Sequence, residues 1–171
     1  DLTAKIAEYK PNLEEYQAFL EYIDFTQAKA NYAYSINGIL PKISESRIIK
    51  LVDAFHPVLF LNNKRKQQKT IPQSLEINEE CRIIIISGPN AGGKSITLKT
   101  IGLLQIMIQS GILVPVKEGS QFGFFNQIFT DIGDNQSIEN HLSTYSYRLK
   151  QMSYFLKNAD EKTLLLVDEF G

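Results

Sequence analysis

The sequence of 171 residues contains a single cysteine, Cys81, and no long apolar run. One cysteine excludes a disulfide within the chain and any cysteine-based metal site, and it favours a reducing environment. No apolar run approaches the roughly 20 residues that a membrane-spanning helix needs. The first ten residues also lack the apolar core of a signal peptide. We therefore expect a cytoplasmic protein with no membrane partner.

An excess of charge of one sign is also lacking, because 18 lysines and arginines nearly balance 19 aspartates and glutamates. The net charge of −1 does not favour nucleic acid, so any contact with DNA or RNA would depend on a local basic patch. Hydrophobic residues make up 43% of the chain, which is ordinary for a globular protein. The length fits one domain with a small appendage. Because the sequence does not begin with Met, we expect a fragment of a longer protein.

The most informative stretch contains the pattern G-x-x-x-x-G-K-S, from Gly88 to Ser95. The apolar, β-branched run at 83–86 predicts a strand buried on both faces, and residues 96–109 predict a helix. A strand, a glycine-rich loop and a helix in this order are the context of a phosphate-binding loop. The alternative is a glycine turn that only joins a strand to a helix.

Each residue type in this loop has a physical role in binding phosphate. Glycines let the backbone approach the phosphates, and successive N–H groups together with the helix N-terminus attract an anion. Lys94 can reach the β and γ phosphates of ATP, and the Ser95 hydroxyl can bind Mg²⁺. The nucleotide-binding residues that we expect here are Gly88, Pro89, Asn90, Ala91, Gly92, Gly93, Lys94, Ser95 and Ile96.

A second, acidic half of this site is predicted at the end of the chain. Residues 163–167 read as an apolar strand that ends in Asp168 and Glu169, which is the Walker B pattern of P-loop ATPases. Asp168 would hold Mg²⁺, and Glu169 would orient and polarise the attacking water, with Lys94 as the other catalytic residue. The alternative is a strand that ends in solvated acids.

The first 37 residues are predicted to be helical, with Pro11 breaking the helix or starting its second part. The Asn12–Glu15 spacing is that of a capping box. Phe19 and Leu20 lie on a face with the apolar period of a helix. We therefore expect them to pack in a core, although the letters around them also match the Phe-x-Glu wedge of some mismatch readers.

The middle of the chain is predicted to be mainly β. Residues 47–61 alternate in polarity and predict one or two strands, with a turn at His56, and residues 71–77 predict another strand. The basic stretch at 62–70 is expected to be a hairpin loop with solvated charges. In the alternative interpretation, Lys64–Lys69 contacts the phosphates of a nucleic acid.

The last third is predicted to contain a short strand near 112–116, a strand or bend at 122–129, and then a helix over 142–158. Ser143 and Thr144 lie at the start of that helix. They either cap it or, in an ATPase that dimerises across its nucleotide, present hydroxyls to a γ-phosphate.

Together these motifs resemble the MutS family of DNA-repair ATPases. Three segments look like that family: the loop Gly88–Ser95, the Ser-Thr-aromatic triplet Ser143–Tyr145 and the ending Leu166–Gly171. The resemblance is closer to the MutS-two branch in three further segments, Tyr22–Ala30, His56–Leu59 and Asp131–Glu139.

The resemblance implies an α/β fold of the P-loop, ABC type, with an antiparallel β-portion before the loop. It implies a helical arm at 1–45 and an ATPase domain at 46–171. Ile71, with Pro72, would lie near the adenine. The resemblance also implies a homodimer with two composite ATP sites. In each site, residues of one subunit would face residues of the other: Lys94, Ser95, Asp168 and Glu169 opposite the partner subunit's Ser143 and Thr144.

We expect an ATPase that couples MgATP hydrolysis to clamping on DNA, or on RNA within a ribosome. The alternatives are another ABC-type ATPase, such as a chromosome-maintenance protein, and a non-enzymatic nucleotide-dependent dimerisation module. A transporter subunit is disfavoured because Leu142–Tyr145 replaces the usual Leu-Ser-Gly-Gly signature. Ala91 and Phe170 are modest departures from the MutS pattern. The chain ends at Gly171, before the family's later strands and dimerising helices, so we expect this fragment to hydrolyse ATP slowly and to dimerise poorly.

Overall fold

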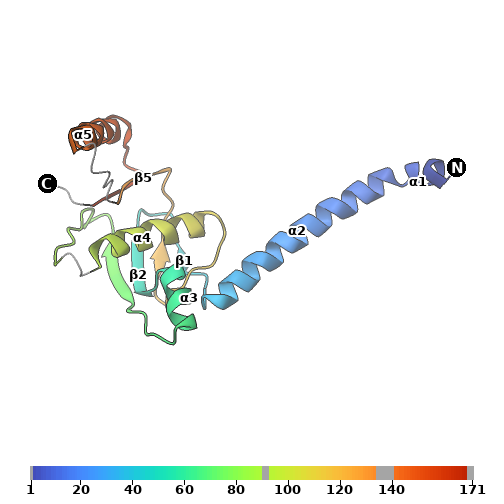
Figure 1. Cartoon of the computed structure of the whole chain (residues 1–171), viewed down its shortest axis with the longest axis horizontal. Coiled ribbons are helices and arrows are strands. Elements are labelled where there is room, and N and C mark those ends of the chain that lie inside the picture. The colour runs from blue at the N-terminus through green and yellow to red at the C-terminus, as the bar shows by residue number, and fades with distance from the viewer. Residues whose placement is uncertain (1, 90–92, 134–140, 169–171) are drawn as a thin grey trace.

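The computed structural model describes residues 2–89, 93–133 and 141–168. Helices α1 (Leu2–Ala7) and α2 (Lys10–Ser35) form an arm that extends far from the rest of the chain (Figure 1). Pro11 lies in the first turn of α2, where a backbone N–H would have no partner within the helix. This confirms the prediction that Pro11 starts the second part of the helix. The predicted capping box is wrong, because the helix is capped by Tyr9 and has no side-chain cap bond.

The apolar side chains of the arm are exposed. Phe19 and Leu20 are 61% and 65% exposed, so the expectation that they pack in a core is wrong for this structure. The end of the arm meets the folded region through the buried residues Ala33 and Ile36 and through a hydrogen bond of 2.9 Å from Lys29 to the carbonyl oxygen of Ser110. A helical period identifies the residues that share a face, but it does not supply the element that covers that face.

Four strands form a mixed sheet in the order β1-β4-β2-β3. They are β1 (Lys42–Ile43), β2 (Ile49–Ala54), β3 (Gln73–Ile77) and β4 (Gln121–Phe122). Strand β2 pairs antiparallel with β3, which confirms the expected antiparallel portion before the loop. Strand β2 also pairs antiparallel with β4, which follows the loop. Strands β5 (Gln127–Asp131) and β6 (Thr163–Val167) form a separate parallel pair. The α/β class is therefore confirmed.

The prediction for residues 47–61 holds only in its first half, because α3 (Pro57–Arg65) follows β2. His56 caps this helix, and its Nδ1 accepts a hydrogen bond of 3.5 Å from the backbone N–H of Leu59. Pro57 suits the first helical position because its φ is already helical. The basic stretch at 62–70 thus begins inside a helix, and the hairpin loop expected there is wrong.

Helix α4 (Lys94–Gln109) lies where the sequence predicts it and ends before Gly111, whose φ is 66°. It supplies much of the core, which also contains side chains of both sheets. The fully covered members of this core include Ile49, Leu51, Leu104, Val114 and Phe122. Helix α5 (His141–Asn158) ends where the prediction ends it.

Residues 81–87 do not form a strand. Ile83 and Ile85 are 80% and 88% exposed, so the prediction of a strand buried on both faces is wrong for this structure. Such a strand needs pairing along its edges and cover on both faces. The strands among the described residues pair with one another and not with this segment. The strand expected near 112–116 is reduced to one bridge between Ile39 and Val114.

Candidate functional site

The end of the glycine-rich loop forms the start of helix α4. Gly93 precedes the helix with a φ of 84°, a left-handed conformation that glycine adopts without strain. Its carbonyl oxygen accepts hydrogen bonds from the N–H and the hydroxyl of Thr97, which close the first turn. Lys94 and Ser95 are therefore in the first turn of α4, where the helix dipole favours an anion.

The lysine of the motif contacts the beginning of the same loop. The Nζ of Lys94 donates a hydrogen bond of 2.6 Å to the backbone carbonyl oxygen of Gly88. The cationic group thus lies beside the backbone that the motif would wrap around a phosphate. Asn90, Ala91 and Gly92 lie outside the described residues.

The acidic strand end is tied to its neighbour in the parallel pair. The N–H of Asp168 donates a 2.9 Å hydrogen bond to the carbonyl oxygen of Asp131, which extends the β5–β6 ladder beyond Val167. Glu169 lies outside the described residues. The carboxyl ends of parallel strands are where ligands bind in open α/β sheets.

The loop helix packs on the strand that leads to Asp168. A Cβ added to Gly102 of α4 would lie 2.8 Å from the Cδ1 of Leu166, and Leu164 and Leu166 are both buried in the shared core. Side chains alternate between the faces of a strand. Positions 164 and 166 therefore share the face of β6 that α4 covers. This packing places the phosphate-loop helix against the strand that Asp168 follows.

Helix α5 covers the other face of the same strands. Phe155 stacks on Phe129 with ring centroids 5.1 Å apart, and Phe129 is the register partner of Leu165. The first turn of α5 contains Ser143 and Thr144, whose backbone is helical. Because α5 already begins at His141, neither residue is its N-cap, and the capping role predicted for them is wrong. Their contact with a γ-phosphate stays a prediction.

One residue of this region was missed by sequence reasoning. Arg148 of α5 donates from Nε to Oδ2 of Asp131 at 3.2 Å and from a terminal nitrogen to the carbonyl oxygen of Asp168 at 3.0 Å. No motif contains it. The available signal was its position four residues after Thr144, which places both residues on one face of a helix.

The other predicted contacts lie in the following places. Ile71 is 81% exposed just before β3, and its role near an adenine stays a prediction.

His56 lies near Lys99 of α4, and its pKa is lowered from the ordinary value first by burial and then by the charge of Lys99. Lys64 donates to the carbonyl oxygen of Ser35 at 3.3 Å, so part of the basic stretch supports the end of the arm.

The donor set fits a magnesium ion. The Ser95 hydroxyl and the Asp168 carboxylate are hard oxygen donors, the kind that Mg²⁺ prefers. Within residues 2–89, 93–133 and 141–168 there is no cluster of three or more His, Cys, Asp or Glu able to hold a metal ion. Mg²⁺ does not require such a cluster, because it commonly keeps several waters and binds through one or two carboxylates and a phosphate.

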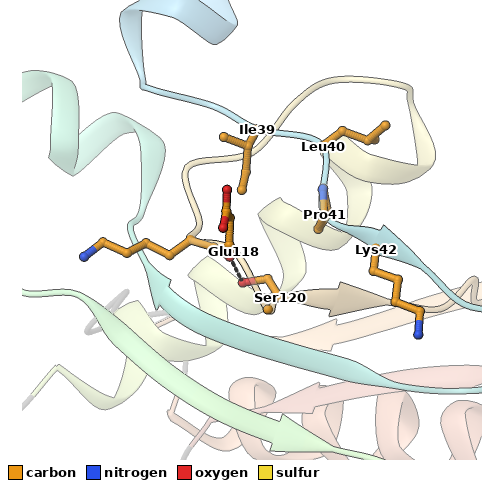
Figure 2. Close-up of a pocket in the computed structure, with 8 residues that line it drawn as sticks. Ile39, Leu40, Pro41, Lys42, Glu118 and Ser120 are labelled. Atoms are coloured by element: carbon orange, nitrogen blue, oxygen red, sulfur yellow. Dashed lines mark hydrogen bonds between the residues drawn. The ribbon is translucent and has the colours of Figure 1, made fainter.

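A pocket of about 290 Å³ lies elsewhere, at the junction of the arm with the first sheet. Figure 2 shows it between the segment from Ile39 to Lys42 and the turn that leads into β4. The hydroxyl of Ser120 donates to the carbonyl oxygen of Lys117 at 2.7 Å, which fixes that turn. None of the predicted nucleotide-binding residues lines this pocket.

No helix in the described part of the chain is long and apolar enough to cross a membrane.

Comparison with known proteins identifies the family. The family model described as MutS domain V matches residues 84–171. Proteins named Endonuclease MutS2 are similar over the whole chain: that of Lactiplantibacillus plantarum is 40% identical over 171 residues, which is 100% of this chain and 21% of the relative. That of Staphylococcus saprophyticus is 41% identical over 170 residues, 99% of this chain and 21% of the relative. The chain thus spans about a fifth of the length of these curated relatives, and it belongs to the MutS family, whose domain V it carries.

Proposed function

We propose that this chain is the nucleotide-binding part of a MutS-type ATPase that couples MgATP turnover to clamping on DNA. The observation that carries the proposal is the contact of Lys94 with Gly88 in a loop that runs directly into buried helix α4. The family match and the Asp168–Glu169 pair after β6 support it. In this proposal the fold is of the P-loop type, with an arm at 1–45 and the ATPase domain at 46–171.

The residues of the chain would divide the work as follows. The loop backbone and Lys94 bind the phosphates, and Ser95 and Asp168 hold Mg²⁺, which when bound neutralises phosphate charge. Glu169 orients and polarises the attacking water. The hydroxyls of the partner subunit's Ser143 and Thr144 complete the site in a homodimer.

The test is ATP binding and hydrolysis by a protein of the relatives' full length, called the full-length protein below. Lys94→Ala should lose tight ATP binding, because charge-assisted hydrogen bonds are the strong ones. Lys99→Ala is the matched control, since Lys99 is an exposed lysine on the same helix. Unchanged ATP affinity in Lys94→Ala would refute the site.

Glu169→Ala separates an enzyme from a binding module. It should keep ATP binding and lose single-turnover hydrolysis, because it removes the group that polarises water. If hydrolysis is absent in the wild-type protein while nucleotide still promotes dimers, the chain is a nucleotide-dependent dimerisation module. Hydrolysis that survives in Glu169→Ala would assign the base to another residue.

The partner of the clamp is a separate question. The full-length protein should bind duplex DNA in an ATP-dependent manner, and Lys94→Ala should remove that dependence. ATP-dependent binding to ribosomes without binding to DNA would instead assign the clamp to RNA.

A further inference from the structure

The guanidinium of Arg148 joins the ends of two neighbouring strands. It donates to the side chain of Asp131 at the end of β5 and to the main chain of Asp168 just after β6. These two residues are themselves linked by the bond from the Asp168 N–H to the Asp131 carbonyl oxygen. Three hydrogen bonds therefore join the ends of β5 and β6. Arginine suits this position because its rigid fork presents several donors at once.

This arrangement differs from an ordinary surface ion pair. The side chain of Asp131 is only 13% exposed and that of Arg148 30%. Exposed pairs contribute little because water screens them and their long side chains are mobile. Here the acid is largely covered and one donor of the arginine reaches a backbone carbonyl, so the geometry of the strand end depends on the pair.

Helix α5 contacts β5 at other positions besides Arg148. Phe155, which is buried, stacks on Phe129 two turns further along the helix. Gln151 adds a hydrogen bond of 3.4 Å to the carbonyl oxygen of Thr130. The contacts of Arg148 are with the last residues of the strands.

Helices α5 and α4 lie on opposite faces of the β5–β6 pair. Arg148 approaches from the α5 side and binds the main chain of Asp168. Gly102 of α4 meets Leu166 on the opposite face of β6. In the proposed site Arg148 therefore acts through the main chain of Asp168.

We infer that Arg148 is a positioning residue: when the start of α5 moves, the hydrogen bonds of Arg148 move Asp168 with it. This inference rests on the proposed function, in which the start of α5 meets the nucleotide of the partner subunit and Asp168 serves its own site. Arg148 lies one turn after Thr144 on the same helix face. It would thus link the two composite sites of a dimer.

The test compares Arg148→Ala and Arg148→Lys in the full-length protein. Small displacements of positioning groups can lower rates by up to about a hundredfold. We expect Arg148→Ala to lower single-turnover ATP hydrolysis about ten- to a hundredfold, with the ATP dissociation constant changed less than about twofold. Lysine can keep the ion pair to Asp131 but has no fork for the second acceptor, so Arg148→Lys should restore hydrolysis only in part. The Hill coefficient for ATP should fall toward one in both variants.

Gln151→Ala is the matched control, because Gln151 lies on the same helix and contacts β5 but not Asp168. It should keep wild-type hydrolysis. If Arg148→Ala does not fold, Arg148→Lys and Asp131→Asn decide the question. A lowered melting temperature with wild-type hydrolysis and Hill coefficient below that temperature would overturn the inference and leave a purely structural role.

The two proposals fail in different ways. If Lys94→Ala keeps ATP binding, the proposed function fails and the inference fails with it. If Lys94→Ala loses ATP binding while Arg148→Ala keeps the wild-type rate and Hill coefficient, the inference alone is wrong.

Discussion

Lys94 and Gly88 are joined by a hydrogen bond of 2.6 Å from the Nζ of the lysine to the carbonyl oxygen of the glycine. The bond connects the start of the glycine-rich loop with the first turn of α4. A phosphate bound by the loop would offer the lysine a charged acceptor in place of this neutral one. The ammonium group of Lys94 attracts an anionic phosphate more strongly than a neutral carbonyl, so the exchange favours the ligand.

The first prediction concerns ligand-induced stability. ATP with Mg²⁺ at about a hundred times its dissociation constant should stabilise the wild-type protein by about 2.7 kcal/mol. Lys94→Ala should lose most of this gain, which thermal unfolding with and without MgATP would measure. The unliganded melting temperature should change little, because the loop carbonyl of Gly88 that accepts from Lys94 is exposed. An equal ATP-induced shift in wild type and variant would contradict the prediction, and Lys99→Ala is the control.

The second prediction compares two glycines that differ in what surrounds them. A Cβ at Gly123 would overlap the backbone carbonyl oxygen of Ser46, whereas a Cβ at Gly102 would meet the end of the Leu166 side chain. Backbone cannot move as a side chain can, so Gly123→Ala should lower the free energy of unfolding by about 3 kcal/mol.

Gly102→Ala should cost about 1 kcal/mol or less, because alanine also regains about 1 kcal/mol of helix propensity. Urea denaturation of both variants measures the difference. Equal losses, or a larger loss for Gly102→Ala, would show that the two contacts have been assigned wrongly.

The third prediction follows from the exposure of the arm. Phe19 is 61% exposed, so Phe19→Ala should change the free energy of unfolding by less than about 0.5 kcal/mol. Leu104 is fully buried in the core, and Leu104→Ala should cost about 2–5 kcal/mol. Denaturant unfolding of this chain checks both values. A loss of several kcal/mol in Phe19→Ala would mean that another element covers the arm in solution.

The fourth prediction is a pH dependence that arises from His56. In the folded chain its pKa lies below the ordinary value of 6.5, so the unfolded chain takes up the proton first as the pH falls. The contribution of His56 to stability is therefore complete above pH 6.5 and is lost as the pH falls through the folded pKa. Protonation would also remove the Nδ1 acceptor that caps α3.

His56→Asn provides the comparison, because asparagine is a good helix cap that does not titrate. The wild-type free energy of unfolding should fall more than that of the variant between about pH 7.5 and about pH 5.5. Parallel curves for the two proteins would show that His56 contributes nothing to the pH dependence.

Much of the fold could be predicted from local patterns. The segments assigned to α4, α5 and β6 are long or strongly periodic, and their predicted ends agree with the structure. Residues 57–61 were predicted wrongly because an apolar run of that length suits either a strand or a helix. The cap at His56 and the proline at the first helical position favour the helix over a strand.

The candidate site was predictable to the extent that it follows a motif. Gly93 and Lys94 have the backbone conformation and the loop contact that suit a phosphate site. The buried strand expected just before the loop was wrong here, because its isoleucines have no ladder and no cover among the described residues. A run of apolar residues shows a preference for burial, but neighbours must satisfy it.

The sequence by itself determined the phosphate-loop pattern, the acidic strand end and membership of the MutS family, because these depend on residue types at short spacings. Only the tertiary structure decided that Arg148 reaches both Asp131 and Asp168. That contact requires β5 and β6 to pair in parallel and α5 to lie on the face opposite α4. Such relations join residues far apart in the chain, and packing of the whole core selects them, so no local pattern records them.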